Sequence, residues 1–513
     1  MTTRNRNTII SLTYHEITKD PRVLKQARVL KQAGYDVDLY CDWQDGFEQY
    51  DDIEDIKITR FRCYADENFR ADVLDEMTFL NRSKDELRSR FIPYASACDE
   101  RYSYETFLDE NLGPNAAERG ESRYFKAAPK EQRIRRLLEY LYIKMRAKFI
   151  KPPVSMEGPK QNPGSYMKVV RWQRQQCRKY RKNLYQAQSI VFYANFPEVE
   201  QSDRYVAVHA HDIYCLPAGV MLSQKLGIPL VYDAHEYEPS RASKMAADGL
   251  NLPEKLEDDC FPHVDRMITV SDGIADLYSK RYRGPSPTVI MNAPEIDPGA
   301  LAYGASRRPG LKSIHEKAGL ADTVPVAVFT GGVQGTNRGM DKVLEAMKMV
   351  PDLHLVVLGP RNERDDTWFM EIAHNMEVAD RVTLLEPVDA RDVPAVISSA
   401  TFSVIPIQDA SLSYHFCLPN KLFEAAFARI PMCVSDLPEM RQFVETLGIG
   451  VVMDQTDPNA IASAMQEMIA NRESYLLTSE AERALSDTYS WQRQSEKLLE
   501  LYEEVLGRPA KSA

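Results

Sequence analysis

The sequence predicts an α/β protein made of two doubly wound, Rossmann-like parallel-sheet domains that face a cleft. Length supports this, because 513 residues exceed what one hydrophobic core usually holds. Short apolar runs alternate twice with segments of helical periodicity, which is typical of parallel sheets covered by helices. A Gly- and Pro-containing stretch at 298–310 separates the two series like a linker. We expect an N-terminal domain over 1–296, a C-terminal domain over 310–485, and a final helix over 486–508 that packs back on the first domain.

The first domain opens with a strand, a helix and a strand in short succession. Thr8–Tyr14 is strand-like, and Asp20 followed by Pro21 is a typical helix start. Gly34 ends this helix, whose apolar residues recur on one face. No Gly-x-Gly-x-x-Gly pattern follows the first strand, so a dinucleotide fingerprint is excluded. Further strands are expected at Asp36–Tyr40, Ile56–Phe61, Tyr205–His211, Ile228–Glu236, Arg266–Ser271 and Pro287–Met291, and helices at Leu216–Leu226 and Asp272–Tyr278.

The second half repeats the alternation. Its apolar runs are bounded by turn residues, and Asp457 before Pro458 is a helix start. The expected strands are Val324–Thr330, Leu353–Leu358, Val382–Leu385, Phe402–Ile407, Met432–Ser435 and Val451–Met453. The expected helices include Met340–Met349, Trp368–Asn375, Val393–Ser399, Ala460–Ala470 and the amphipathic tail Trp491–Leu506.

An insertion with helical segments interrupts the first domain at about 65–203. Within it, residues 133–182 contain 15 Lys or Arg and only two acids, in a chain of net charge −11. One interpretation is a solvated helix packed on the domain. The other is a surface that meets anionic lipid or an anionic, lipid-linked substrate. Nucleic acid is not the expected partner, because no known binding module surrounds this basic block.

Composition narrows the class and the compartment. A content of 44% hydrophobic and 27% charged residues is typical of a globular protein, and no apolar run is long enough to span a membrane. The N-terminus has no signal-peptide pattern. The eight cysteines include no Cys-x-x-Cys pair, which suits a reducing cytosol. We therefore expect a cytoplasmic protein, with peripheral contact to the inner membrane face through the basic block.

The segment Leu418–Phe427 lies between two predicted strands and carries a cation and an acid in one helical turn. Asn420 is the expected N-cap, which places Lys421 at the first helical position and Glu424 three residues later on the same face. A helix N-terminus with a lysine is suited to phosphate, and a carboxylate beside it to two vicinal ribose hydroxyls. The alternative is that Glu424 only complements the helix dipole and Lys421 is solvated.

A second candidate phosphate loop follows the strand Val324–Thr330. Glycines 331, 332 and 335 allow a close backbone approach, and Arg338, at the expected start of the next helix, adds a positive charge. In a doubly wound domain such loops converge on one rim. With Lys421, Arg338 would stabilise a diphosphate leaving group, whereas ordinary Gly-rich turns are the alternative.

Polar residues also end two strands of the first domain. His209 and His211 lie on one strand end, and His235 and Glu236 follow the next. Histidines and carboxylates together are metal-ligand types, but no third histidine with ligand spacing accompanies them. We therefore expect no metal, and we expect His235 and Glu236 to bind sugar.

With these residues in view, the chain resembles the GT-B glycosyltransferases, specifically the large retaining family 4. The resemblance covers 8–62 and 204–506. The segments that carry it are Asp20–Ala27, Ala33–Val37, His209–Asp212, Tyr232–Glu236, Thr269–Ser271, Gly331–Ala346 and Leu418–Glu424.

The resemblance implies a retaining, metal-independent transfer from a nucleoside-diphosphate sugar of the UDP or GDP type. It implies that Arg338 and Lys421 contact the diphosphate, Glu424 holds the ribose, and His235 lies near the transferred sugar. These three groups, Arg338, Lys421 and His235, are the expected catalytic residues. The expected nucleotide-sugar site comprises Gly331, Gly332, Gly335, Arg338, Val388, Asn420, Lys421, Leu422 and Glu424. His211 and Glu236 are expected on the acceptor side.

Three departures from the family pattern affect the sugar end of this site. Many members carry a second glutamate where this chain has Phe416, and an arginine where it has Gly332. Asn420 and Lys421 are inserted before Leu-Phe-Glu. The leading hypothesis is a glycosyltransferase acting on a glycan or lipid-linked acceptor in cell-envelope or surface polysaccharide synthesis. The alternatives are a nucleotide-sugar 2-epimerase of the same architecture and a catalytically degenerate scaffold protein.

Overall fold

The computed structural model describes residues 7–17, 21–42, 46–61, 203–240, 257–258, 260–295, 310–333 and 335–507. The predicted insertion 65–203, with its basic block 133–182, lies outside these residues except for Asp203. The predicted linker 298–310 lies outside them except for Gly310. Within the described part of the chain, no helix has both the length and the apolar character needed to cross a bilayer.

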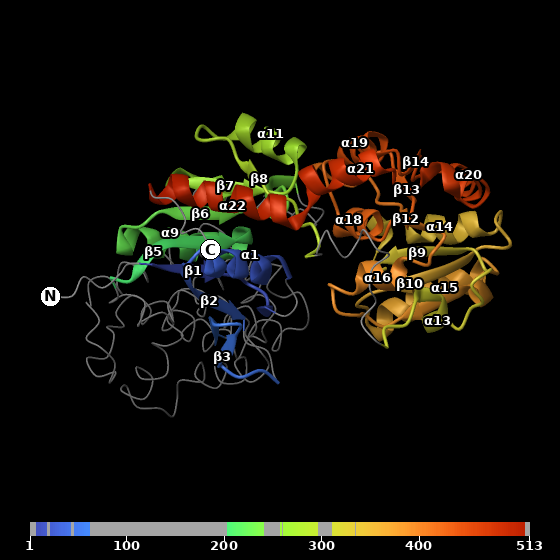
Figure 1. Ribbon diagram of the computed structural model, residues 1–513, viewed down its shortest axis with the longest axis horizontal. Helices are drawn as coiled ribbons and strands as arrows, with labels where there is room; N and C mark the ends of the chain where they lie inside the picture. Colours follow the sequence, from blue (N-terminus) through green and yellow to red (C-terminus); the bar gives the residue numbers. More distant parts are fainter. Residues whose placement is uncertain are drawn as a thin grey trace, which may run out of the picture. The chain divides into compact units, whose positions relative to one another are not determined.

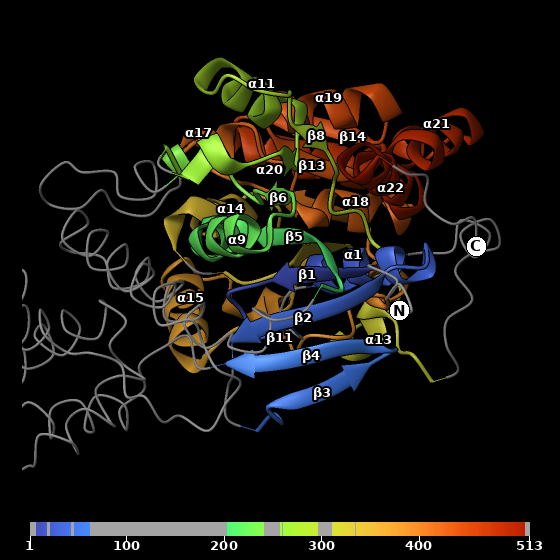
Figure 2. The same cartoon turned by 90° about the vertical axis from the view of Figure 1, so that its left-hand side faces the viewer.

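The first sheet has eight strands in the order β3-β4-β2-β1-β5-β6-β7-β8. Strands β1, β2, β4, β5 and β6 pair in parallel register, and so do β7 and β8. Figure 2 shows the blue strands β1, β2, β4 and β3 side by side. The strands are β1 (Thr8–Leu12), β2 (Asp36–Asp42), β3 (Tyr50–Ile53), β4 (Ile56–Phe61), β5 (Tyr205–His211), β6 (Leu230–Asp233), β7 (Arg266–Thr269) and β8 (Thr288–Val289).

The edge strand β3 was not predicted from the sequence. It is antiparallel to β4, and Glu54 and Asp55 form the two-residue turn between them with φ of 55° and 62°. Two successive residues with positive φ are typical of two-residue hairpin turns, whose backbone twist matches the right-handed twist of the two strands. The usual Asn-Gly or Asp-Gly signal is missing, and β3 itself is polar and exposed, so the pattern favoured a loop.

The helices of this region follow the predicted series with one shifted start. They are α1 (Pro21–Gln32), α9 (Asp212–Leu226) and α11 (Asp272–Arg281). Gly227 closes α9 in the left-handed conformation, as Gly at a C-terminus should. The helix predicted from Leu216 begins at Asp212 instead. Asp212 has a left-handed φ of 58° directly after β5, and the helix includes Pro217 in its second turn.

The second sheet has six strands, all parallel, in the order β11-β10-β9-β12-β13-β14. The direction of winding reverses between β9 and β12, which is the topological switch point of such a sheet. All six lie at predicted positions. Figure 1 labels β9, β10, β12, β13 and β14 of this sheet. They are β9 (Val326–Thr330), β10 (His354–Leu358), β11 (Val382–Leu385), β12 (Phe402–Ile405), β13 (Met432–Ser435) and β14 (Gly450–Met453).

Helices cover both faces of this sheet. Successive side chains of a strand point to opposite faces, and here both sets are apolar and need to be buried. Val326 and Val328 join one buried cluster, and Ala327 and Phe329 join another. The first cluster includes residues of α13 (Ile314–Ala318), α16 (Val393–Ile397), α18 (Asn420–Phe427), α19 (Pro438–Leu447) and α21 (Ser479–Ala484). The second includes residues of α14 (Met340–Met347), α15 (Glu363–Asn375) and α20 (Pro458–Ala470).

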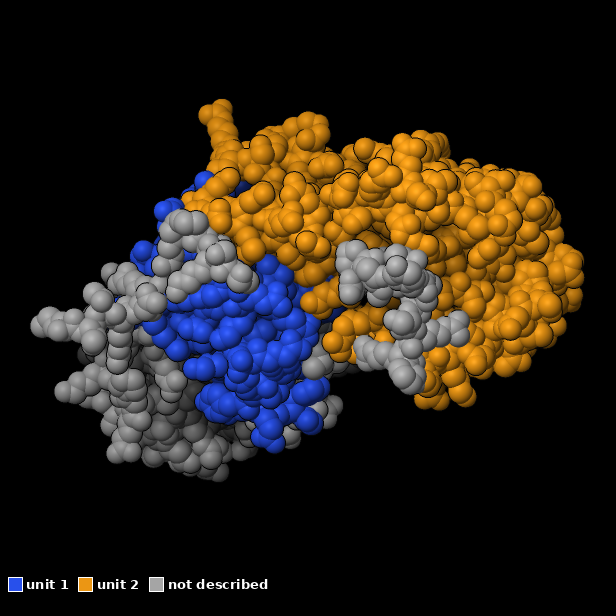
Figure 3. All heavy atoms as spheres, viewed as in Figure 1, with its two compact units in different colours: residues 1–233, 244–266, 505–513 blue, residues 234–243, 267–504 orange. Residues whose placement is uncertain are grey.

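By spatial contact the chain divides into two compact units (Figure 3). The first comprises 1–233, 244–266 and 505–513, and the second comprises 234–243 and 267–504. The second unit therefore contains the residues that follow β6 as well as the six-stranded sheet. The domain boundaries at 296, 310 and 486 stay predictions.

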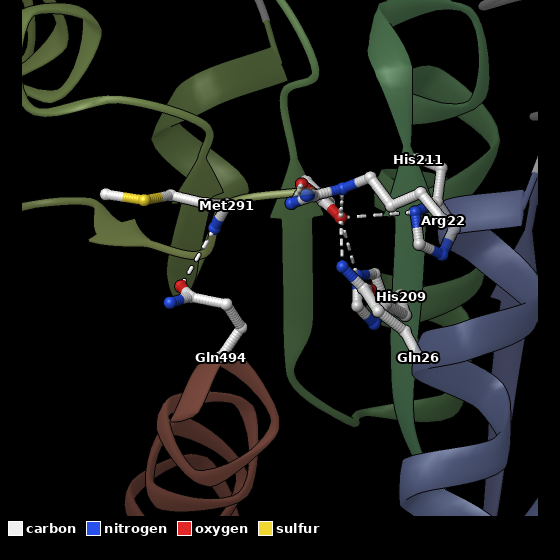
Figure 4. Close-up of polar contacts among 7 residues, drawn as sticks. Arg22, Gln26, His209, His211, Met291 and Gln494 are labelled. Atoms are coloured by element: carbon white, nitrogen blue, oxygen red, sulfur yellow. Dashed lines mark hydrogen bonds and ion pairs between the residues drawn. The ribbon is translucent and has the colours of Figure 1, made fainter. Parts of the chain in front are cut away.

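The C-terminal helix α22 (Trp491–Leu506) has the predicted bounds. Its fully buried Gln494 accepts a hydrogen bond from the Met291 amide at 3.0 Å (Figure 4). Lys497 donates to the carbonyl of Val289 in β8 at 3.3 Å. This helix thus bonds to the end of the eight-stranded sheet within the second unit.

Candidate active site

The candidate site of the second unit is built on the loops that leave β9 and β12, on either side of the switch point. Parallel strands end at one edge, so loops after neighbouring strands converge there, and this is where α/β sheets bind ligands. Both loops were predicted from the sequence to bind phosphate.

The loop after β9 is shaped by two glycines. Gly331 has φ of 114°, which favours glycine, and its amide donates to the Leu358 carbonyl at 2.8 Å. Gly339 has φ of 69°, and a Cβ there would lie 2.0 Å from the Pro406 carbonyl oxygen. The loop after β12 therefore lies directly against this turn. Gly332 is half-buried and Gly335 is exposed in the same loop.

Arg338 does not open the following helix, contrary to the prediction. It ends a 3-10 turn over Thr336–Arg338, and α14 begins at Met340 after the left-handed Gly339. The approach of Gly339 to Pro406, invisible in a local pattern, separates the two helical segments. Arg338 remains half-buried at the edge of the sheet.

Helix α18 begins one residue earlier than predicted. Pro419 occupies the N-cap position with extended backbone, Asn420 is the first helical residue, and no side chain caps the helix. The fixed φ of proline suits that position, and its carbonyl accepts the first bond from the Leu422 amide at 3.0 Å. Asn420 is exposed and Leu422 is buried. Lys421 is therefore the second helical residue, still in the first turn.

Lys421 is a buried ammonium group close to the glycine loop. Its side chain is 9% exposed, and its Nζ lies 4.8 Å from the centre of the Phe329 ring. Nζ also lies 3.6 Å from where a Cβ on Gly331 would be. Among the described residues, none forms a hydrogen bond or ion pair with this Nζ. The side chain of Lys421 is therefore largely buried.

The electrostatics of this lysine reflect its surroundings. Burial, and then the charge of Arg338, lowers the pKa of Lys421 to about 8, while Glu424 and Cys417 act in the opposite direction. Two cations close enough to repel each other, on one sheet edge, are arranged for an anion with more than one charge.

Glu424 lies one turn further along α18, on the face of Lys421. Its Oε2 accepts a hydrogen bond from the Thr330 hydroxyl at 2.5 Å, which ties the helix to the end of β9. Glu424 as a whole residue is half-buried. The predicted three-residue spacing thus brings the acid and the cation together.

Val388, the predicted base-binding residue, follows β11 at the same edge. It is half-buried and packs against the hydrophobic cluster that contains α18. Arg361 shapes this part of the edge, because it donates to the carbonyls of Gly359 and Leu385 at 2.7 and 2.6 Å. Arg361 could not be predicted as a site residue, since a lone arginine after a strand carries no local signal.

His235 and Glu236 follow β6 and belong to the second unit, as the phosphate loops do. Both are half-buried. Tyr278 of α11 donates to the Glu236 carbonyl at 3.2 Å, which holds this turn. The charge of Glu236 is among those that raise the pKa of Cys417, so the carboxylate lies within electrostatic reach of the segment before α18.

His211 lies in the first unit, in a buried polar network centred on Asp233 (Figure 4). The Arg22 guanidinium of α1 donates to both carboxylate oxygens of Asp233 at 2.8 and 3.0 Å, and Gln26 donates to one of them at 2.8 Å. The His211 Nδ1 lies 3.3 Å from the same carboxylate, and its ring stacks on His209. Local sequence patterns do not reveal Arg22, Gln26 and Asp233 as a set, because their contacts span more than 200 residues.

This network has the residue types of a metal site. His209, His211 and Asp233 offer ligand atoms within 4.8 Å of one another. However, the Arg22 guanidinium already neutralises the carboxylate, and its fixed positive charge opposes a bound cation. The contacts of Asp233 join α1, β5 and β6.

Two models of known families match the chain. The model described as glycosyl transferase 4-like domain matches residues 157–293, and the model described as glycosyl transferases group 1 matches residues 324–471. Together they span more than half of the 513 residues. The first match begins inside the segment that the sequence analysis treats as an insertion.

Individual proteins show the same likeness. The D-inositol 3-phosphate glycosyltransferase of Salinispora arenicola is 23% identical over 59% of this chain and 69% of that protein. The alpha-maltose-1-phosphate synthase of Mycolicibacterium smegmatis is 24% identical over 61% of this chain and 82% of that protein. Sucrose-phosphate synthase from Thermosynechococcus elongatus has a similar structure, with a TM-score of 0.60, 13% identity and coverage of 98% of this chain and 100% of that chain.

The two sheets, parallel except for β3, have the GT-B fold, which the sucrose-phosphate synthase structure shares. The family matches are independent of that geometry and agree with it. The chain belongs to the glycosyltransferases of the family 4 type, as the sequence resemblance implied.

Proposed function

We propose that this enzyme is a retaining glycosyltransferase that moves a sugar from a nucleoside-diphosphate sugar to a glycan or lipid-linked acceptor. The observation that carries the donor side is Lys421, a largely buried cation that forms no ion pair with any described residue and lies beside Arg338 at the switch point. A buried charge of this kind is unfavourable until an anion neutralises it. A diphosphate supplies that anion in the substrate and gains further charge as it leaves.

The remaining donor contacts follow from the loops already described. The amides and open Cα positions of Gly331, Gly332 and Gly335 allow the phosphates to approach. Glu424 accepts hydrogen bonds from the ribose hydroxyls. Val388, the exposed Asn420 and the backbone near Leu422 complete the nucleotide side.

The proposed chemical step depends on stabilising the negative charge of the departing diphosphate. As the glycosidic bond breaks, Arg338 and Lys421 balance the charge that develops on the diphosphate, which is the task Mg²⁺ has in other transferases. We therefore propose a reaction without a metal ion. His235 lies near the transferred sugar, and Glu236 and His211 lie on the acceptor side.

The acceptor is proposed from the basic block 133–182 and from the relatives. The block favours an anionic or lipid-linked acceptor at the inner membrane face in envelope or surface polysaccharide synthesis. The two relatives quoted above are named for D-inositol 3-phosphate and for maltose 1-phosphate. The basic block and the names of the two relatives both favour an acceptor that carries phosphate.

The test is release of nucleoside diphosphate from a panel of UDP and GDP sugars, with and without phosphorylated and lipid-linked acceptors. Transfer supports the proposal. Isomerisation of donor alone would instead favour the 2-epimerase, and donor binding with no turnover would favour the scaffold. NMR of the product anomeric centre decides retention against inversion.

Glu424→Ala tests the ribose contact within the same assay. We expect donor affinity to fall by roughly 10- to 100-fold, as for the loss of charged hydrogen bonds of about 1.5–3 kcal/mol. Glu445→Ala, on an exposed helix face, is the matched control. Unchanged donor affinity in Glu424→Ala would remove the ribose role while leaving the transferase activity standing.

A further inference from the structure

The segment Ser411–Cys417 directly precedes helix α18 and is held by residues that follow β6 and β7. It contains the short helix α17 (Leu412–His415). Its last residue, Cys417, lies four residues before Lys421, the second residue of α18. All of these residues belong to the second compact unit. Nothing in the sequence indicated this contact.

Two serine hydroxyls join α17 to the loop 235–240. The Tyr237 amide donates to Ser413 Oγ at 3.2 Å, and the Leu412 amide donates to Ser240 Oγ at 3.2 Å. Ser413 is buried. Because the loop 235–240 also contains His235 and Glu236, α17 touches the proposed acceptor side through backbone amides.

A third serine holds the other end of the segment. Ser271 donates from its Oγ to the Phe416 carbonyl at 2.7 Å, and the same hydroxyl accepts the Ile274 amide as the N-cap of α11. A hydroxyl makes both bonds at once, because it is a donor and an acceptor. The carbonyl of Phe416 is therefore held by the first turn of α11.

Gly273 provides the space for the Phe416 ring. A Cβ on Gly273 would lie 2.2 Å from Cδ1 of that ring and 2.7 Å from Glu439 Oε1. The Gly273 amide also donates to Glu439 at the start of α19 at 2.5 Å. Any larger residue at 273 must displace Phe416, and only glycine leaves the contact as it is.

The connection from Phe416 to Lys421 is short and stiff. Cys417 and Leu418 are largely buried, and Pro419 has a fixed φ. A displacement of Phe416 is therefore transmitted to the first turn of α18 rather than absorbed by a loose loop.

We propose that Ser413, Ser271 and Gly273 are positioning residues that couple the loop 235–240 to the start of α18. The proposal rests on the donor role of Lys421. When a nucleoside diphosphate binds Lys421, it restricts the motion of the first turn of α18. The segment Ser411–Cys417 is then restricted as well, and its Ser413 hydroxyl stabilises the hydrogen bond from the Tyr237 amide. The acceptor-side loop is then organised by the donor, and the coupling works equally in the other direction.

Hydrogen exchange measured by mass spectrometry on the full chain tests this coupling, with UDP or GDP as the probe, whichever gives the larger rise in Tm. In the unsubstituted chain, the nucleotide should slow exchange in 236–240 as well as in 420–424. Ser413→Ala should reduce the protection of 236–240 at least threefold while the nucleotide Kd changes less than threefold. Protection that is missing from the parent chain, or unchanged in Ser413→Ala, would overturn the proposal.

Ser411→Ala is the matched control. Ser411 caps α17 by accepting the Tyr414 amide, so its loss weakens the same helix while the contacts of Ser413 and Ser271 remain. It should behave like the parent chain. Equal loss of remote protection in Ser411→Ala would show that helix α17 alone matters, which contradicts the assigned role of Ser413.

A measurement without nucleotide separates this proposal from the proposed function. Ser413→Ala should speed exchange of the Tyr237 amide about tenfold at unchanged Tm, and Ser411→Ala should not. If neither nucleotide binds, the donor site fails and the coupling fails with it, yet the Tyr237 amide still reports whether Ser413 holds the loop. Gly273→Ala should act like Ser413→Ala, and adding Phe416→Ala, which removes the clashing ring, should restore protection.

Discussion

At the scale of single residues, the most informative feature of this enzyme is a lysine in an unfavourable place. Lys421 is buried near a second cation, and burial with the Arg338 charge lowers its pKa to about 8. Natural proteins retain such groups where function requires them. The residue should therefore weaken the fold in the absence of ligand.

Lys421→Met should stabilise the ligand-free protein and abolish transfer. One pKa unit corresponds to about 1.4 kcal/mol, so the buried charge accounts for on the order of 1–3 kcal/mol that methionine would recover. Urea unfolding and the donor assay measure the two effects. The exposed Lys348→Met is the control and should change neither. A destabilised but active Lys421→Met enzyme would contradict the role of this lysine.

Donor binding should depend on pH through the same group. Nucleoside diphosphate binds the protonated lysine, so its affinity should fall as pH rises above about 8, and binding should take up a proton there. Calorimetry at pH 7 and 9.5, in buffers of different ionisation enthalpy, measures both. Lys421→Met should flatten the profile, and an affinity that rises with pH would count against the assignment.

The stability of the free protein has the opposite pH dependence. The lysine pKa is about 8 in the folded chain against 10.5 in the unfolded one, so the unfolded chain binds more protons between these values. The contribution of Lys421 to stability is least favourable below about pH 8 and improves toward pH 10.5. This trend should disappear in Lys421→Met.

At the scale of elements, the strands were predictable and the turns between them were less so. Alternating or continuous apolar runs located all six strands of the second sheet, because burial dictates side-chain type. The polar edge strand β3 was not found, and Arg338 lies in a separate 3-10 turn before α14, although α14 itself starts at the predicted Met340. Both depend on left-handed turns whose residues, Glu54, Asp55 and Gly339, are explained only by their partners in space.

Gly339→Ala should disrupt the loop that carries Arg338. Its φ of 69° disfavours alanine, and the Cβ would also meet the Pro406 carbonyl at 2.0 Å. Gly319→Ala is a matched control, since Gly319 has φ of 68° with nothing within 4 Å of its Cβ position. The control should cost about 1 kcal/mol in the free energy of unfolding. Gly339→Ala should cost at least twice that and weaken nucleotide binding, and equal costs would refute the close approach.

At the scale of the whole molecule, charge is divided unevenly along the chain. Residues 133–182 carry 15 basic and two acidic residues in a protein of net charge −11. Such a block can act at a distance set by ionic strength. The membrane contact proposed for it is therefore testable without further structure.

Full-length enzyme should sediment with anionic vesicles, such as phosphatidylcholine with phosphatidylserine, at low salt. Binding should fall steeply between about 50 and 500 mM salt, because the Debye length shrinks severalfold over that range. Phosphatidylcholine vesicles are the lipid control, and a chain with Arg133→Gln, Arg135→Gln and Arg136→Gln is the protein control. Salt-independent or absent binding would remove the membrane role.

The sequence by itself determined the alternation of strands and helices, the glycine loop that carries Arg338, the helix start that carries Lys421, and the family. These are properties of local pattern and spacing, which burial and helix geometry govern directly. Only the tertiary structure decided that Lys421 is largely buried without an ion pair to any described residue, that Arg22 neutralises Asp233, and that Ser413 and Ser271 hold the segment before α18. Those facts depend on side chains far apart in the chain, and packing alone brings them within bonding distance.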